Sequence, residues 1–351
     1  MAAGRFSFAA LLFLAACQAA PAAMSVGTFS PTTVTTPTTT TTAPTTTAAP
    51  TTTAPTTTIP PKGSVVIDGV GDTNFDPNYI RAFQETGYGW AFEGLDGLFL
   101  EDDLTIVNLE CSPSDLGDPL DKPFTFRCDP AALPMMSQFG VEVANLANNH
   151  GQDYGSEAML DGRQNLIDAG LAPVGVGADV AQATEPAVFE VNGWKVAVIG
   201  FGGVVPSHSW IATEDQPGMA DGDDTDAMVE AVTRAATVSD FVVVTIHWGV
   251  ELDTLPRDDD VRRAEAMIAA GADVIFGHHP HRLQPLEMVA GRPVAWSLGN
   301  FIWPRLSTAG ATTAVARVII SPDGSLEACL IPAEIESSGH PVLTAEPPCH
   351  G

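Results

Sequence analysis

A short apolar strand that runs directly into histidines most constrains how this chain can fold. Residues 272–276 form an apolar run typical of a buried strand, and His278, His279 and His281 follow it after one glycine. Pro280 makes the turn rigid and keeps His279 out of the helical region. Open α/β sheets bind their ligands at the carboxyl ends of strands. We therefore expect the histidines to form one wall of a site.

Four further predicted strands end in side chains typical of metal or acid–base sites. The residues at these ends are Asp72 with Asn74, Asn108 with Glu110, Asn149 with His150, and His247. A single polar residue after a strand is more often a turn residue or a helix cap. Five such ends in one chain, each with a glycine nearby, instead predict a shared site.

The types of donor atom indicate divalent metal ions. Carboxylates, a carboxamide and imidazoles without a thiolate suit one or two ions of Mn, Zn or Fe, or a hydrated Mg. Glu110 is able to bridge two ions, and two ions roughly 3.5–4 Å apart can clamp a phosphoryl group. A histidine beside the ions but not bound to them can protonate a leaving group. His150, next to the predicted ligand Asn149, fits that role.

The hydrophobic pattern predicts one α/β domain with a mixed, two-layered sheet covered by helices. Helices are expected over residues 79–86, 92–101, 131–139, 156–169, 225–237 and 258–270, and Asp153 is placed to cap the fourth. Strands are expected over residues 64–70, 104–109, 141–146, 171–176 and 241–246, and again over 272–276. Hairpins are expected over residues 187–201, 285–298 and 312–331.

The amino-terminal segment predicts an exported, lipid-anchored chain. Residues 1–17 contain a short apolar run that ends in Leu14–Cys17, which matches the bacterial lipobox with Cys17 as the lipidated residue. The alternative is an ordinary signal cleaved after the small residues 21–23. Residues 18–62 are rich in Thr, Pro and Ala and predict a disordered tether. We expect the folded domain over residues 63–333, a tail over 334–351, and a location on the outer face of the cell membrane.

The remaining cysteines are an even number, which in an exported chain indicates disulfides. They are Cys111, Cys128, Cys329 and Cys349, and four cysteines allow three pairings. We favour Cys111–Cys128 and Cys329–Cys349 because each pair is local; the second would pin the tail.

Charge excludes one class of partner. With 43 acidic against 15 basic side chains and a net charge of -28, the chain repels nucleic acid and anionic headgroups.

Six ordered blocks of the sequence resemble the signature blocks of the CapA family, the capsule or poly-γ-glutamate synthesis proteins. The blocks are Gly71–Asp72, Asn108–Glu110, Asn148–His150 with Asp153 and Gly155, His247–Gly249 with Glu251, Gly277–His281 with Gln284, and Ser297–Phe301. They span residues 65–302. The resemblance implies a metallophosphoesterase-like fold, a four-layer αββα sandwich with its site at strand ends. It also implies a membrane-anchored protein that faces outward and acts on poly-γ-glutamate capsule.

The resemblance also implies roles for single residues. The implied metal ligands are Asp72, Glu110, Asn149, His247, His279 and His281, with His150 as the general acid. Asn74 stands where metallophosphoesterases have a histidine, and Glu110 where they usually have a bridging aspartate. Residues expected to touch substrate or orient ligands are Asn74, Asn108, Asp153, Glu251, Gln284 and Asn300. His278 is expected to be structural, because its side chain should point away from that of His279.

Three functions remain open at this point. The first is a cell-surface, metal-dependent hydrolase or transferase that acts on poly-γ-glutamate or another capsule polymer. The second is a non-catalytic capsule-assembly protein on the same fold, which would bind the polymer or its synthase complex. The third is a surface phosphodiesterase unrelated to capsule, which rests on kinship of fold alone.

Overall fold

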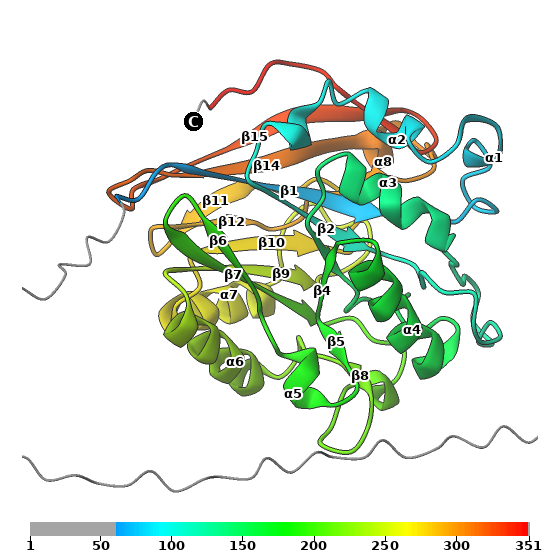
Figure 1. The fold of residues 1–351 in the computed structure, drawn as a ribbon, viewed down its shortest axis with the longest axis horizontal. Coiled ribbons are helices and arrows are strands. Elements are labelled where there is room, and N and C mark those ends of the chain that lie inside the picture. Colours follow the sequence, from blue (N-terminus) through cyan, green and yellow to red (C-terminus); the bar gives the residue numbers. More distant parts are fainter. Residues whose placement is uncertain (1–60, 350–351) are drawn as a thin grey trace, which may run out of the picture. The chain divides into compact units, whose positions relative to one another are not determined.

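The protein is described by a computed structural model that covers residues 61–349 (Figure 1). The predicted signal, the lipidation site Cys17 and residues 18–60 of the predicted tether lie outside this part of the chain. Within residues 61–349, the structure contains no helix with the length and apolar character needed to cross a membrane.

Two large sheets form the centre of the domain. The first has the strand order β16 (His340–Leu343), β15 (Leu326–Ser337), β14 (Thr312–Ile320), β1 (Val65–Thr73), β2 (Leu104–Leu109), β3 (Val143–Asn145) and β4 (Ala172–Val174), and β13 (Asn300–Ile302) also pairs with β1. The second has the order β11 (Leu286–Val289), β12 (Arg292–Ala295), β10 (Val274–His278), β9 (Phe241–His247), β7 (Trp194–Gly202) and β6 (Ala187–Val191). A small third sheet pairs β5 (Val176–Gly177) with β8 (Gly218–Met219).

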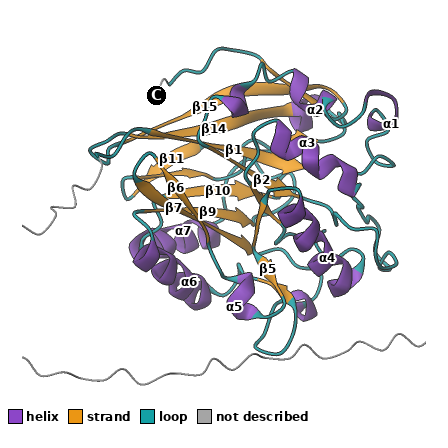
Figure 2. Ribbon diagram, in the orientation of Figure 1, coloured by secondary structure: helices purple, strands orange, loops and turns teal. Residues whose placement is uncertain are grey.

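Helices cover the outer face of each sheet (Figures 1 and 2). Those against the first sheet are α1 (Phe83–Thr86), α2 (Trp90–Glu93), α3 (Leu133–Gln138) and α4 (Gly155–Asp168), whereas α5 (Val180–Ala183), α6 (Thr225–Val238) and α7 (Asp258–Ala270) lie on the side of the second. Short helices η1 (Leu98–Leu100), η2 (Pro130–Ala132), η3 (His208–Trp210) and α8 (Thr308–Ala311) sit in connections. The layers follow the order αββα, which confirms the predicted fold class.

The parallel centre of each sheet aligns the strand ends that carry the polar residues. In the first sheet Asp72 of β1 stands opposite Asn108 of β2, and in the second His278 of β10 stands opposite His247 of β9. The sheets pack closely because β1 has a glycine where it faces the other layer. A Cβ atom at Gly69 would lie 2.6 Å from the ring of Phe276. This close contact brings the ends of β1 and β10 together.

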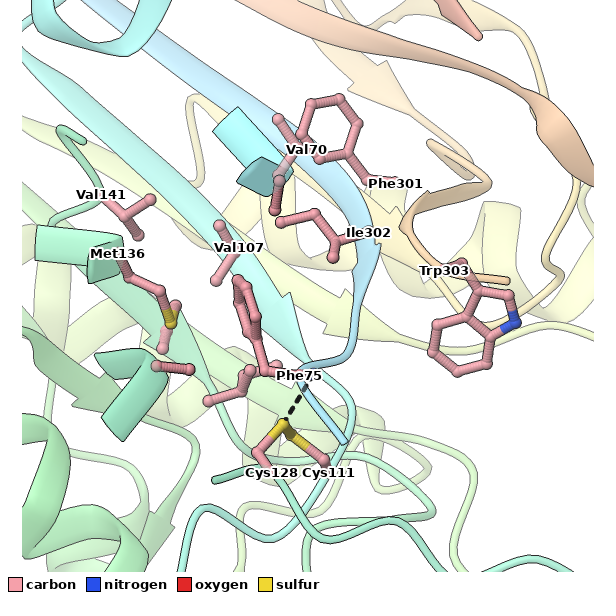
Figure 3. Close-up of a cluster of buried hydrophobic side chains, with 14 of the residues drawn as sticks. Val70, Phe75, Val107, Cys111, Cys128, Met136, Val141, Phe301, Ile302 and Trp303 are labelled. Carbon is pink, nitrogen blue, oxygen red and sulfur yellow. Dashed lines mark hydrogen bonds between the residues drawn. A yellow bond between two sulfur atoms is a disulfide. The ribbon is translucent and has the colours of Figure 1, made fainter. Parts of the chain in front are cut away.

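Besides the packed interface between the two sheets, a hydrophobic core lies between the first sheet and its helices (Figure 3). Val70 of β1 and Val107 of β2 pack there near Phe75. The disulfide Cys111–Cys128 borders this core, and the backbone N–H of Phe75 donates to Cys128 Sγ at 2.9 Å. Both disulfides join the predicted partners, since Cys329 on β15 pairs with Cys349 near the carboxyl end of the described residues.

Some predicted boundaries are wrong. The helices expected over residues 79–86 and 92–101 shrink to single turns, and in the second of them Gly94 and Gly97 interrupt the helix. The predicted end of the domain at residue 333 falls inside β15, which runs to Ser337 and pairs with β16. Ala333 and Ile335 continue the buried alternation of this strand. Residues 334–343 therefore belong to the sheet and not to a tail.

We expect Gly69→Ala to lower the free energy of unfolding by about 1–3 kcal/mol, because the added methyl overpacks a filled core. Urea unfolding measures this loss, and adding Phe276→Leu should recover part of it by making room for the methyl. Gly89→Ala is the matched control, because its φ is -60° and its Cβ would meet only the Phe139 ring at 3.4 Å. Equal losses in the two alanine variants would contradict the packing argument.

Candidate metal centre

The strand ends of both sheets bring five of the predicted ligands together around Glu110. One group of potential ligand atoms, all within 4.8 Å of one another, comes from Glu110, His247 and His279. A second group comes from Asp72, Glu110 and His281 under the same limit. Glu110 belongs to both groups, as expected of a residue that bridges two ions.

The Glu110 carboxylate is the least satisfied group of the site. The side chain is fully buried, and neither oxygen has a hydrogen-bond donor within residues 61–349. Burial and the negative charge of Asp72 raise the pKa of Glu110 well above its usual range. Nδ1 of His279 is likewise buried and unpaired in this part of the chain. Carboxylate and imidazole atoms left without partners fit a divalent cation, which would offset the cost of burying them.

Asp72 and His281 form an ion pair at the end of β1. His281 Nδ1 lies 3.0 Å from Asp72 Oδ2. Burial alone would favour the uncharged form of both groups, but the opposite charges nearby have the larger combined effect. The His281 imidazole lowers the pKa of Asp72, whereas Glu110 and Asp72 raise the pKa of His281 to about 9. Protons on His281 therefore compete with a metal ion for this position.

The turn after β10 aims its imidazoles by an unusual backbone. His279 has a φ of 94° and His281 a φ of 52°, which is the left-handed region that non-glycine residues rarely adopt. The Asp72 carboxylate lies 3.3 Å from the backbone N–H of His279 and stabilises the turn. Such strain collects at functional sites, where the surrounding structure enforces it.

Asparagine side chains contact two of the predicted ligands, Asp72 and His247, and fix their orientation. Asn108 Nδ2 donates to Asp72 Oδ1 at 2.9 Å and lies 3.1 Å from Nδ1 of His247. Nε2 of His247 lies 2.7 Å from Oδ1 of Asn149, which places that predicted ligand at the edge of the group. Burial and neighbouring histidines lower the pKa of His247 well below its usual range, so its ring is neutral, the form that binds metals.

His150 is held with one nitrogen toward the ligands. Its Nδ1 lies 2.6 Å from Asp153 Oδ2, and its Nε2 lies 3.9 Å from Glu110 Oε1. The expectation that Asp153 caps α4 is wrong, since the helix starts at Gly155 after Tyr154 and has no side-chain cap. Asp153 instead fixes the imidazole. Burial lowers the pKa of His150 although Asp153 opposes the shift.

Sequence reasoning missed Lys122. Its ammonium donates to Asp153 Oδ1 and to the carbonyl of Asn149, both at 2.6 Å. The residue lies in the loop that the Cys111–Cys128 disulfide closes. The spacing to its partners gave no signal, because they lie on a separate turn. The ring of Phe126 on the same loop packs against the His150 ring, with 4.2 Å between the ring centroids. No sequence pattern predicts this contact either.

The other predicted residues take different places. Oδ1 of Asn74 accepts from the N–H of Asp76 at 2.7 Å, so Asn74 makes a turn. Gln284 donates to the carbonyl of Asp253. Asn300 and the exposed Glu251 line a cavity beside the site. His278 joins neither ligand group: its Nε2 lies 3.0 Å from Thr245 Oγ1, although its Nδ1 comes within 4.0 Å of Asp72.

Comparison with known proteins identifies the family. Residues 66–305 match the family model described as bacterial capsule synthesis protein PGA_cap. The chain belongs to this family. It is 29% identical over 272 residues to the PGA biosynthesis protein CapA of Bacillus subtilis (strain 168), covering 77% of this chain and 71% of that protein.

Two further proteins are similar to this chain. The chain is 32% identical over 230 residues to the capsule biosynthesis protein CapA of Bacillus anthracis, covering 64% of this chain and 56% of that protein. Among solved structures, the sulfate thiohydrolase SoxB of Thermus thermophilus matches with a TM-score of 0.46 and 15% identity, covering 78% of this chain and 58% of that one.

We expect the affinity for Mn²⁺ to rise from acidic pH up to about 9, because Glu110 and His281 must lose protons to bind it and the pKa of each is raised. Isothermal titration in buffers of different ionisation enthalpy counts the protons released. The exposed His208 lies outside the site, so His208→Ala should leave the pH dependence unchanged. An affinity that does not vary with pH would contradict this assignment of ligands.

Removal of the Lys122 charge should raise the pKa of His150, because the ammonium lowers it in the native protein. NMR titration of the imidazole resonances in Lys122→Met measures this shift. Lys195→Met serves as the control, since that lysine is exposed on β7. A His150 pKa that is unchanged or lower in Lys122→Met would show that the lysine has no electrostatic role here.

Proposed function

We propose that this protein is a metal-dependent hydrolase or transferase that acts on poly-γ-glutamate, or another capsule polymer, at the outer cell surface. The observation that carries the proposal is the buried carboxylate of Glu110, which has no hydrogen-bond donor within residues 61–349 and belongs to two groups of ligands, with His150 Nε2 at 3.9 Å. Membership of the PGA_cap family and relatives named for PGA and capsule biosynthesis support the substrate. The surface location rests on the predicted signal and on the predicted lipidation of Cys17.

Different residues of the site would bind the metal and donate the proton. Asp72, Glu110, His247, His279 and His281 would hold the metal, with Asn149 beside them. Divalent ions bound there would polarise a phosphoryl or acyl oxygen and lower the pKa of water. His150 receives orientation from Asp153, which accepts from its Nδ1–H and leaves Nε2 facing the ligands. Since burial lowers the pKa of His150, its protonated form is a stronger acid and gives its proton readily to a leaving group.

We expect Glu110→Gln to abolish binding of Mn²⁺, and His150→Ala to retain it. The second variant should lower the rate of polymer breakdown or transfer about 10²–10⁴-fold, as loss of a general acid does. Chromatography of poly-γ-glutamate and release of nitrophenol from a phosphodiester, bis(p-nitrophenyl) phosphate, are the two assays. His208→Ala should match the unmodified protein in both.

Each contrary result selects another function. Bound Mn²⁺ with no activity on either substrate, and a normal capsule in cells that carry His150→Ala, would identify a non-catalytic assembly protein. Activity on the phosphodiester alone would identify a surface phosphodiesterase. Absence of metal binding by the unmodified protein would overturn the proposal itself.

A further inference from the structure

Two cavities meet over the candidate metal centre. The first, which we name the aromatic cavity, is lined by Tyr79, Phe126, Trp303, Leu306, Arg282 and Asn300. The second, the aliphatic cavity, is lined by Lys122, Pro123, Val204, Val205 and Pro206. Phe124, His150 and Glu251 line both. The candidate acid therefore stands where the two cavities join.

Each cavity opens on a different group of metal ligands. His281, of the group with Asp72, lines the aromatic cavity, whereas His279, of the group with His247, lines the aliphatic one. Glu110 belongs to both groups and lies buried between them. A bond that reacts beside His150 thus has room for substrate on both of its sides.

The walls of the two cavities differ in chemistry. In the aromatic cavity Arg282 offers a guanidinium whose Nη1 also donates to the carbonyl of His281 at 2.7 Å. Asn300 Oδ1 is buried and has no donor within residues 61–349, whereas its Nδ2 donates to the Gly310 carbonyl. In the aliphatic cavity the Lys122 ammonium is occupied by Asp153 and by the Asn149 carbonyl, so the walls away from the metal ligands are mainly valine and proline side chains. Phe124 and the carboxylate of Glu251 line this cavity where it joins the aromatic one.

These walls match a chain that alternates charged amide units with methylene segments. A carboxylate and an amide N–H suit Arg282 and Asn300, and methylene groups suit the valine and proline walls. Resting on the proposed function, we propose that an acidic polyamide chain lies across both cavities, so that an internal bond faces His150 and the enzyme cuts within the chain. Water adds to the amide carbonyl carbon, the C–N bond breaks, and the leaving nitrogen takes its proton from His150, which regains one from the water.

The test is binding by the Mn²⁺-loaded, full-length protein, measured as fluorescence anisotropy of labelled poly-γ-glutamate of defined lengths. Affinity should rise with length until both cavities are filled. Val205→Trp, which fills the aliphatic cavity, should weaken binding of long chains about tenfold and spare short ones. Arg282→Met should weaken both by a similar factor. Val188→Trp is the control, because that valine is exposed on β6 away from the site.

The products of end-labelled polymer provide the second measurement. Cutting within the chain gives fragments of many intermediate lengths, whereas release of single units would keep the proposed function and overturn this inference. Equal affinity for short and long chains, or long-chain binding unaffected by Val205→Trp, would also overturn it. Failure to bind or cleave poly-γ-glutamate of any length would overturn the proposed substrate and this inference together.

Discussion

The buried carboxylate of Glu110 is the constraint on which the rest of the site depends. A carboxylate held away from water without a hydrogen bond destabilises a fold unless a cation or a proton compensates it. Both oxygens of Glu110 are in this position within the described residues, and its pKa is raised by burial. The fold tolerates this because packing around it is fixed, as the contact of Gly69 with Phe276 illustrates. The buried carboxylate thus lowers the stability of the fold locally, but it keeps a strong anionic ligand in place for a cation.

A disulfide and a series of hydrogen bonds connect this candidate ligand to the candidate acid. Cys111 directly follows Glu110, and its disulfide with Cys128 closes the loop that carries Lys122 and Phe126. Through Lys122 the loop holds Asp153, which in turn holds His150. A movement of the loop would therefore disturb the acid and the bridging ligand together.

Much of the site follows from the rule that parallel strands align their carboxyl ends. That rule placed Asp72, Glu110 and His247 at one edge, because each follows an apolar strand whose burial its composition dictates. It could not place Lys122, because a loop closed by a disulfide has no periodicity to read. The cap role expected of Asp153 was wrong, since a cap and a partner of His150 share the same position before a helix. The end of β15 was missed because polar and half-buried residues interrupt the apolar alternation along this strand.

Net charge and local charge act at different ranges in this protein. A net charge of -28 repels an anionic polymer, but salt screens this repulsion beyond about 10 Å at moderate ionic strength. Inside the cleft the relevant charges are the positive ones of Arg282, His281 and the metal ions that the ligands would hold, together with the negative charge of Glu251, and a low-dielectric wall strengthens them. The acidic surface therefore slows encounter without forbidding binding at the centre. The charges inside the cleft, rather than those of the surface as a whole, would therefore decide whether an anionic polymer binds.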